Sequence, residues 1–313
     1  MIVELPNTTT SQITKKIVKM REQGGVVTLG RVLTLVVITR NGSEEEAITA
    51  ANLASREHPC RIIVLASGSD TEETRLDGEI RVGGDAGASE VIVLRGFGEL
   101  AVESESVISA LLLPDAPIVA WWPNEAPESP STSPIGRIAH RRITDSRNAH
   151  DPKEALIRIG STYAAGDTDL AWTRLTNWRI QLAAALEEYD GDDPITALRV
   201  EGASDSPSTL LLAAWLHRAL NVPITVVHGP RGTGIRTVVM EREKGTVTLT
   251  RPGAMEATLT QPDQPEQQIS LPRRSLQDCL AEELRRLDPD EVFGEVVTEG
   301  LKKLLAEEEV VQS

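Results

Sequence analysis

The chain has 313 residues, of which 40% are apolar and 25% are charged, so it is long enough to bury one large core or two ordinary ones. Acidic residues outnumber basic residues 47 to 32, and the net charge of −15 disfavours binding to nucleic acid or to an anionic membrane surface. Two distant cysteines, an N-terminus without a signal pattern and the lack of a bilayer-length apolar run predict a cytoplasmic protein without a disulfide framework.

Apolar, β-branched runs alternate with helical patterns in the first part of the chain. The expected strands are residues 32–39, 61–66, 91–95 and 117–122. Ser43 and Glu46 match a capping box for a helix that ends near residue 58, and a second helix is expected over 103–113. This alternation predicts a parallel or mixed sheet with helices on its faces.

A proline- and serine-rich stretch, 123–134, breaks this alternation and is expected to form a loop. Two helical stretches, a second βαβ pattern, an antiparallel meander and further helices follow. These elements are expected at helices 152–163 and 169–189, strand 196–201, helix 208–220, strand 223–228, meander strands 236–241, 246–251, 257–259 and 268–271, and helices from 275 and from 290 to 307. The sequence therefore predicts an α/β fold with two βαβ-containing parts, 1–165 and 166–313, whose sheets are parallel or mixed.

No segment carries a defensible catalytic, cofactor or metal motif. Residues 229–234 (GPRGTG) resemble a phosphate loop, but they lack the lysine and the hydroxyl that such a loop needs, so a turn is expected. The glycine cluster at 81–87 lacks the spacing of a dinucleotide fingerprint, and 190–193 (DGDD) has only the start of a calcium loop. The five histidines show no ligand spacing, and no nucleophile–base pattern appears. We therefore expect no catalytic residues, no metal and no cofactor.

The most unusual segment is 121–148. Two adjacent tryptophans precede the proline-rich loop, and arginines then gather in an otherwise acidic protein. Tryptophan and arginine are enriched in interface hot spots, so one interpretation is a contact surface for a partner protein. The alternative is that both tryptophans belong to the core and the arginines neutralise nearby acid. The candidate contact residues are Trp121, Trp122, Arg137, Arg141, Arg142, Asp145 and Arg147.

Several segments, taken together, carry a family resemblance over most of the chain up to Arg179. They are MIVELPNTTTSQI, RIIVLAS, EIRVGGDAGASEVIVLR, LLLPDAPIVAWWP, RRITDSRNA and AGDTDLAWTRLTNWR. In this order they resemble the glucose-6-phosphate dehydrogenase assembly protein family (OpcA), and residues 196–229 and the strands after them fit as well. The resemblance implies a non-enzymatic protein that binds glucose-6-phosphate dehydrogenase, promotes its active oligomer and supports the oxidative pentose phosphate pathway. It implies no catalytic residues.

Two other functions stay open on the residues alone. One is an α/β enzyme or sensor that binds a sugar phosphate or a nucleotide at the carboxyl ends of its strands. Saturable binding of such a ligand, with turnover, would distinguish it. The other is a scaffold for a different metabolic enzyme, which an unbiased pull-down would identify.

Overall fold

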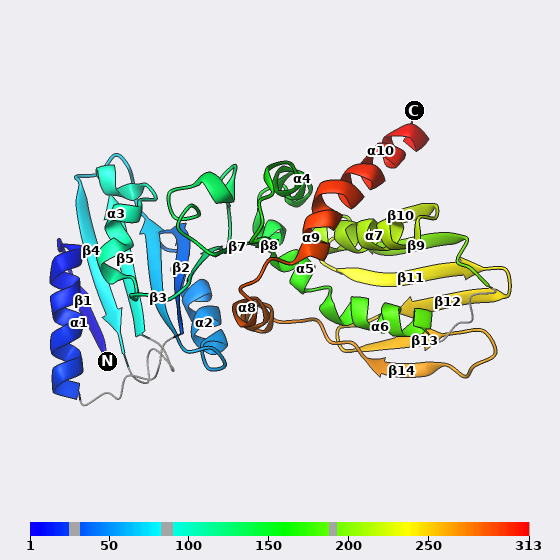
Figure 1. Cartoon of the computed structure of the whole chain (residues 1–313), viewed down its shortest axis with the longest axis horizontal. Helices are drawn as coiled ribbons and strands as arrows, with labels where there is room; N and C mark the ends of the chain where they lie inside the picture. Colours follow the sequence, from blue (N-terminus) through cyan, green and yellow to red (C-terminus); the bar gives the residue numbers. More distant parts are fainter. Residues whose placement is uncertain (25–31, 83–89, 188–192, 313) are drawn as a thin grey trace. The chain divides into compact units, whose positions relative to one another are not determined.

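The computed structural model describes residues 1–24, 32–82, 90–187 and 193–312. The chain divides into two compact units (Figure 1). The first unit comprises Met1–Asp145 and Leu276–Pro289, and the second comprises Ser146–Ser275 and Asp290–Ser313. The sequence predicted a single division between residues 165 and 166. In the compact units, residues 146–165 group with the second unit, and helix α8 (Leu276–Arg285), late in the chain, packs against helix α2 (Glu44–Ala54) of the first unit.

The first unit is built on a mixed β-sheet. Its strands are β1 (Ile2–Leu5), β2 (Leu33–Arg40), β3 (Cys60–Ser67), β4 (Arg75–Arg81), β5 (Glu90–Phe97), β6 (Ile118–Trp122) and β7 (Arg141–Thr144). They lie in the order β1-β4-β5-β3-β2-β6-β7. Neighbours from β5 to β7 are parallel, whereas β4 is antiparallel to β5 and β1 is antiparallel to β4. The predicted mixed sheet is confirmed.

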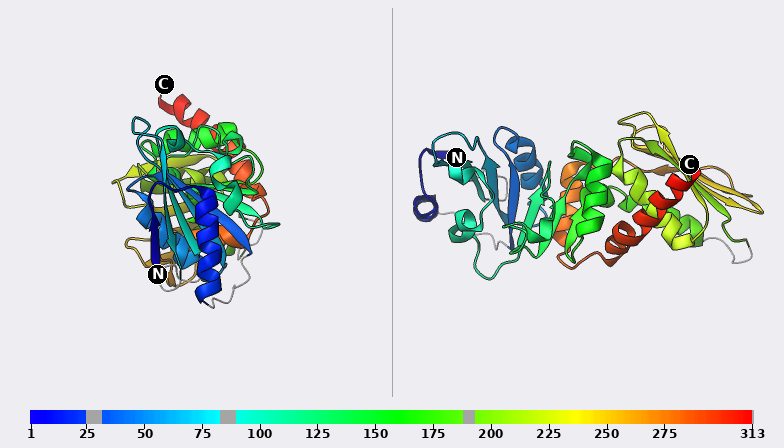
Figure 2. Two further views of the ribbon diagram at one scale, coloured as in Figure 1. Left: turned by 90° about the vertical axis from the view of Figure 1, so that its left-hand side faces the viewer. Right: turned by 90° about the horizontal axis from the view of Figure 1, so that it is seen from above.

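Helices cover both faces of this sheet. Apolar side chains of α1 (Thr10–Gly24), α3 (Glu105–Ile108) and the 3-10 turn η3 (Ser109–Leu111) share one core with residues from the sheet. Helix α2 lies on the opposite face (Figure 2). Strands β2 and β3 are apolar on both faces and almost wholly buried, as expected for parallel strands covered on both sides. Two further 3-10 turns, η2 (Gly98–Ala101) and η4 (Pro130–Thr132), lie in the connections.

The second unit has its own sheet, with strand order β10-β9-β11-β12-β13-β14. The strands are β9 (Ala197–Ala203), β10 (Ile224–Gly229), β11 (Ile235–Arg242), β12 (Gly245–Thr250), β13 (Glu256–Thr260) and β14 (Gln267–Ser270). Helix α7 (Pro207–Leu220) connects the parallel pair β9 and β10, and the remaining strands form the predicted antiparallel meander.

The other helices of the second unit pack on this sheet and on α7 around a separate core. They are α4 (Pro152–Thr162), α5 (Leu170–Thr173), α6 (Thr176–Glu187), α9 (Glu291–Glu295) and α10 (Leu301–Gln312), with a π-helical segment η6 (Val296–Gly300) between α9 and α10. A short strand, β8 (Asp167–Asp169), precedes α5, and a 3-10 turn, η5 (Ser146–Asn148), precedes α4. Trp172, Trp178 and Phe293 are the bulky centre of the core.

Several predicted helices are wrong in extent. The helix expected over 103–113 is only α3 and a 3-10 turn, and the one expected over 169–189 divides into α5 and α6 at Arg174 and Leu175. The predicted capping box is also wrong, because the Ser43 side chain makes no capping hydrogen bond. The loop 123–134 contains only a single 3-10 turn, as its prolines indicate.

Candidate functional site

The first unit has the strand order of a dinucleotide-binding sheet. The run β5-β3-β2-β6-β7 corresponds to the order 3-2-1-4-5 of a doubly wound fold, and the order reverses between β2 and β6. In such sheets the ligand binds at the carboxyl ends of these two strands. Its pyrophosphate lies at the N-terminus of the helix after the first strand. The corresponding helix here is α2.

A carboxylate occupies that helix N-terminus. The backbone N–H of Gly42 donates to Glu44 Oε2 at 2.6 Å, and Arg95 Nε donates to Glu44 Oε1 at 2.9 Å. The Glu44 side chain is buried, and Glu45 and Glu46 also lie in the first turn. Three carboxylates here complement the positive end of the helix dipole but repel a pyrophosphate. The residues therefore do not fit a dinucleotide.

The Glu44–Arg95 pair belongs to a larger charge network on the first unit. Arg95 Nη1 donates to Glu79 at 2.9 Å, and Arg81 donates to Glu79 and to Glu45 at 2.5 Å. The hydrogen bond with Glu45 raises the pKa of Arg81, and the same bond lowers the pKa of Glu45. The network joins α2 to β4 and β5, so this helix N-terminus is part of the scaffold.

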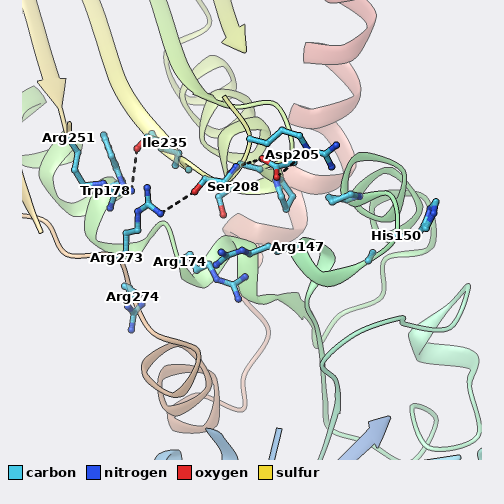
Figure 3. A pocket seen from close by; sticks show the side chains of 17 residues that line it. Arg147, His150, Arg174, Trp178, Asp205, Ser208, Ile235, Arg251, Arg273 and Arg274 are labelled. Atoms are coloured by element: carbon cyan, nitrogen blue, oxygen red, sulfur yellow. Dashed lines mark hydrogen bonds and ion pairs between the residues drawn. The ribbon is translucent and has the colours of Figure 1, made fainter. Parts of the chain in front are cut away.

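A pocket in the second unit has the opposite charge. It has a volume of about 240 Å³ and lies where α7 begins, beside the ends of β9 and β10 and the turn after β10 (Figure 3). One carboxylate lines it, Asp205, together with His150 and six arginines. The arginines are Arg147, Arg174, Arg231, Arg251, Arg273 and Arg274. In a chain with a net charge of −15, this is a local concentration of positive charge.

Backbone carbonyls hold several of these arginines in place. Arg273 Nη1 donates to Gly232 O at 3.2 Å and its Nη2 donates to Thr233 O. Arg274 Nη1 donates to Thr173 O at 2.8 Å. Such contacts to carbonyl oxygens fix the orientation of a guanidinium and leave its formal charge in place.

The sole acidic side chain of the pocket, Asp205, is already engaged. The backbone N–H of Gly232 donates to Asp205 Oδ1 at 3.0 Å, which lowers the pKa of Asp205, and Arg231 Nε lies 3.6 Å from its Oδ2. Asp205 thus stays ionised and fixes the turn that carries Arg231.

Arg251 is the most buried cation of the pocket, with 7% of its surface exposed. Its Nη1 and Nη2 donate to Leu271 O and Ile235 O at 3.3 and 3.2 Å, and its guanidinium lies 5.1 Å from the ring centre of Trp178. Its buried Nε has no hydrogen-bond partner among the described residues. Burial and the neighbouring charge of Arg273 lower the pKa of Arg251 to about 10.

The candidate contact residues of the 121–148 segment are mostly buried. Trp121 and Trp122 lie in the core, where Trp122 Nε1 donates to Glu103 at 3.3 Å. Arg141 donates to Glu283 of α8 at 2.5 Å and to the backbone oxygen of Asp288 at 2.7 Å. For these residues the structure agrees with the alternative interpretation, in which the tryptophans are core and arginine neutralises acid.

The remaining candidates differ in exposure. Arg142 and Asp145 are buried, and Arg142 Nη1 donates to Ala139 O at 3.0 Å. Arg137 and Arg147 are exposed. Of the whole set, only Arg147 lines the arginine pocket.

Sequence reasoning missed the pocket because its arginines come from separate segments. Arg147 precedes α4, Arg174 lies between α5 and α6, Arg231 follows β10, Arg251 follows β12, and Arg273 lies between β14 and α8. Only folding brings these charges together. The one available signal was the segment 229–234, which follows a strand at the site, and the prediction that it forms a turn is confirmed.

Two segments that the sequence analysis rejected as ligand sites lie largely outside the described residues. They are the glycine cluster, at residues 83–87, and the acidic segment, at residues 190–192. Within the described part of the chain, no group of three or more histidine, cysteine, aspartate or glutamate side chains is placed to hold a metal ion. No described helix is long and apolar enough to cross a bilayer. Cys60 and Cys279 are both fully buried, as expected for small apolar side chains.

Comparison with solved structures gives distant likenesses. A variant of KijD10, a 3-ketoreductase from Actinomadura kijaniata solved with NADP, is 9% identical, with a TM-score of 0.50 over 88% of this chain and 97% of that one. Glucose-6-phosphate 1-dehydrogenase from Mycobacterium avium is 12% identical, with a TM-score of 0.49 over 88% of this chain and 92% of that one. The first likeness shows an α/β fold. No curated protein matches the chain.

Two family models match consecutive parts of the chain, and both describe a subunit of glucose-6-phosphate dehydrogenase. The model of its N-terminal domain matches residues 51–161, and the model of its C-terminal domain matches residues 165–297. Together they cover most of both units, and they agree with the resemblance seen in the sequence. The chain belongs to the OpcA family of glucose-6-phosphate dehydrogenase subunits.

Proposed function

We propose that this protein binds glucose-6-phosphate dehydrogenase and promotes its active oligomer without catalysing a reaction itself. Membership of the OpcA family carries the proposal. Through this dehydrogenase the protein would support the oxidative pentose phosphate pathway. Its own role would be to stabilise the active form of the enzyme by binding that form more tightly than the inactive one.

The N-terminus of α2 supports the non-catalytic part of the proposal. In a dehydrogenase with this strand order, backbone N–H groups at that point bind the cofactor's pyrophosphate. Here the N–H of Gly42 is already bonded to the carboxylate of Glu44, which Arg95 also holds. The position that would have to bind a dinucleotide therefore holds the buried Glu44 carboxylate and its ion pair with Arg95.

The test is a kinetic titration of the dehydrogenase with the purified chain. We expect the chain alone to show no turnover with glucose 6-phosphate and either nicotinamide cofactor, and to raise the kcat/KM of the enzyme to a plateau as it is added. Sedimentation of the same mixtures should show a shift of the dehydrogenase to a larger assembly. Unchanged kinetics and sedimentation at saturating amounts of the chain would refute the proposal.

We propose that Arg137 of the first unit and Arg147 of the second, the exposed members of the candidate set, each contact the dehydrogenase. Arginine at an interface binds carboxylates and stacks on aromatic rings, and charge complementarity makes such association sensitive to salt. Arg137→Glu and Arg147→Glu should each weaken the binding of the dehydrogenase, more strongly at low salt. Arg56→Glu, which reverses another exposed charge, is the matched control. Equal affinities for all three variants and the native chain would place the interface elsewhere.

A further inference from the structure

We propose that the arginine pocket of the second unit is a binding site for a small phosphorylated metabolite, a phosphate monoester of about the size of a sugar phosphate. The inference concerns the isolated chain and does not rest on the proposed role toward the dehydrogenase. It stands on three independent features of the pocket, which are its buried cation, its helix N-terminus and its size.

The buried cation is Arg251. A charge that is withdrawn from water is normally paired with an opposite charge, because its desolvation costs several kcal/mol. Arg251 is 93% buried, yet its guanidinium donates only to two backbone carbonyls, and its Nε has no partner among the described residues. The other charge close to it, Arg273, repels it and contributes to its lowered pKa. A bound anion would supply the missing negative charge, and perturbed groups of this kind concentrate at functional sites.

The second feature is the N-terminus of α7, a helix of 14 residues. Its N-cap Ser206 and its first residues, Pro207 and Ser208, all line the pocket, and they follow the end of β9 at Ala203 after a turn that contains Asp205. Its first turn holds no acidic residue, and Ser206 makes no side-chain capping bond. This contrasts with α2 of the first unit, where three glutamates occupy the same position. A helix N-terminus after a parallel strand attracts phosphate through its N–H groups and dipole.

The third feature is size. The pocket volume of about 240 Å³ is below the roughly 300–1,000 Å³ of pockets that hold drug-sized ligands, so it suits a compact ligand. Arginine matches the geometry of phosphate through paired N–H donors, and several converge here. Trp178 and Pro207 add apolar wall beside them, against which the carbon skeleton of a monoester could pack. The flat surface of a folded partner could not reach a cation as buried as Arg251.

Calorimetric titration of the full-length chain tests this, at one fixed ionic strength because salt screens the pocket. The probes are a hexose 6-phosphate, a pentose 5-phosphate, the unphosphorylated hexose and inorganic phosphate. We expect saturable binding of at least one sugar phosphate, weaker binding of inorganic phosphate and none of the free sugar. The ligand should also raise Tm, because it binds only the folded chain. No binding of either sugar phosphate at millimolar concentration, or equal binding of inorganic phosphate, would overturn the proposal.

Variants locate the site. Arg273→Gln removes an exposed pocket charge and should lower affinity at least about tenfold, the loss expected for a charge-assisted hydrogen bond. Arg199→Gln, in β9 of the same unit but outside the pocket, is the control and should bind as the native chain does. Arg251→Gln is a second probe if it folds. The proposal would be wrong if Arg273→Gln left the affinity for sugar phosphate unchanged but abolished binding to the dehydrogenase. The pocket would then bind an acidic segment of that partner.

Discussion

Arg141 and Glu283 form an ion pair that is almost entirely removed from water, with 3% and 6% of their side chains exposed. Removing Arg141 takes this ion-pair partner from the buried Glu283 carboxylate, and breaking a buried pair costs about 3–5 kcal/mol. We expect Arg141→Ala to lower the free energy of unfolding by that amount. Denaturant titration measures it, with Arg137→Ala, an exposed arginine nearby, as a control that should change stability by less than about 0.5 kcal/mol.

A paired replacement separates charge from packing in this prediction. Arg141→Met combined with Glu283→Leu removes both charges, and buried pairs replaced by apolar side chains are often close to neutral in stability. The double variant should therefore recover most of the loss. If Arg141→Ala is as stable as Arg137→Ala, the pair does not contribute as its burial indicates.

In the second unit, two glycines lie where the backbones of neighbouring helices approach each other closely. A Cβ added to Gly160 of α4 would lie 2.4 Å from the carbonyl oxygen of Val297 in η6, and one on Gly300 would lie 3.0 Å from Ala214 O of α7. The π-helical segment η6 therefore packs between α4 and α7 at distances that leave little room for a Cβ atom at these two positions.

Gly160→Ala tests this packing, because propensity and packing predict opposite signs. Alanine in a helix gains up to about 1 kcal/mol over glycine, whereas overpacking costs about 1–3 kcal/mol. We expect a net loss of stability, measured by thermal and denaturant unfolding. Gly253→Ala, where no atom lies within 4 Å of the added Cβ, serves as the control. A stabilised Gly160→Ala variant would show that α4 and η6 are not in close contact.

The strands that are buried on both faces could be predicted from the sequence. The strand β4, which carries charged side chains, could not. The strands β2, β3, β5 and β6 have apolar runs that specify them locally. By contrast, β4 (RLDGEIR) reads as a polar segment, and it is a strand because Arg81 and Glu79 find partners on α2 and β5. Neighbours distant in sequence decide such an element.

The same distinction applies to the sites. The dense arginine cluster of 137–147 suggested a surface, but burial places Arg141 and Arg142 in the scaffold. The arginine pocket draws on segments spread from Arg147 to Arg274, none of which is conspicuous by itself. Arginines that are close together along the chain can be recognised in the sequence, whereas arginines from distant segments come together only in the folded protein.

At the scale of the whole molecule, the first unit is discontinuous. Residues 1–145 lack α8, which packs on α2 and provides Glu283 for Arg141. A fragment of residues 1–145 should therefore unfold with low cooperativity and a low Tm. Fusing residues 276–289 to its end through a flexible linker should restore a cooperative transition, as measured by calorimetry. Equal transitions for the two fragments would show that α8 is dispensable.

The discontinuity also sets an order of events during synthesis. The ribosome must add all residues from 146 to 289 before the first unit has its last helix, which at about 5–20 residues per second takes on the order of ten seconds. Throughout that interval the nascent first unit has an unpaired Arg141 and an uncovered face of α2. The first unit is therefore complete only when residue 289 has been added, although its first 145 residues are made long before, and a chaperone that shields Arg141 and the bare face of α2 would act in this window.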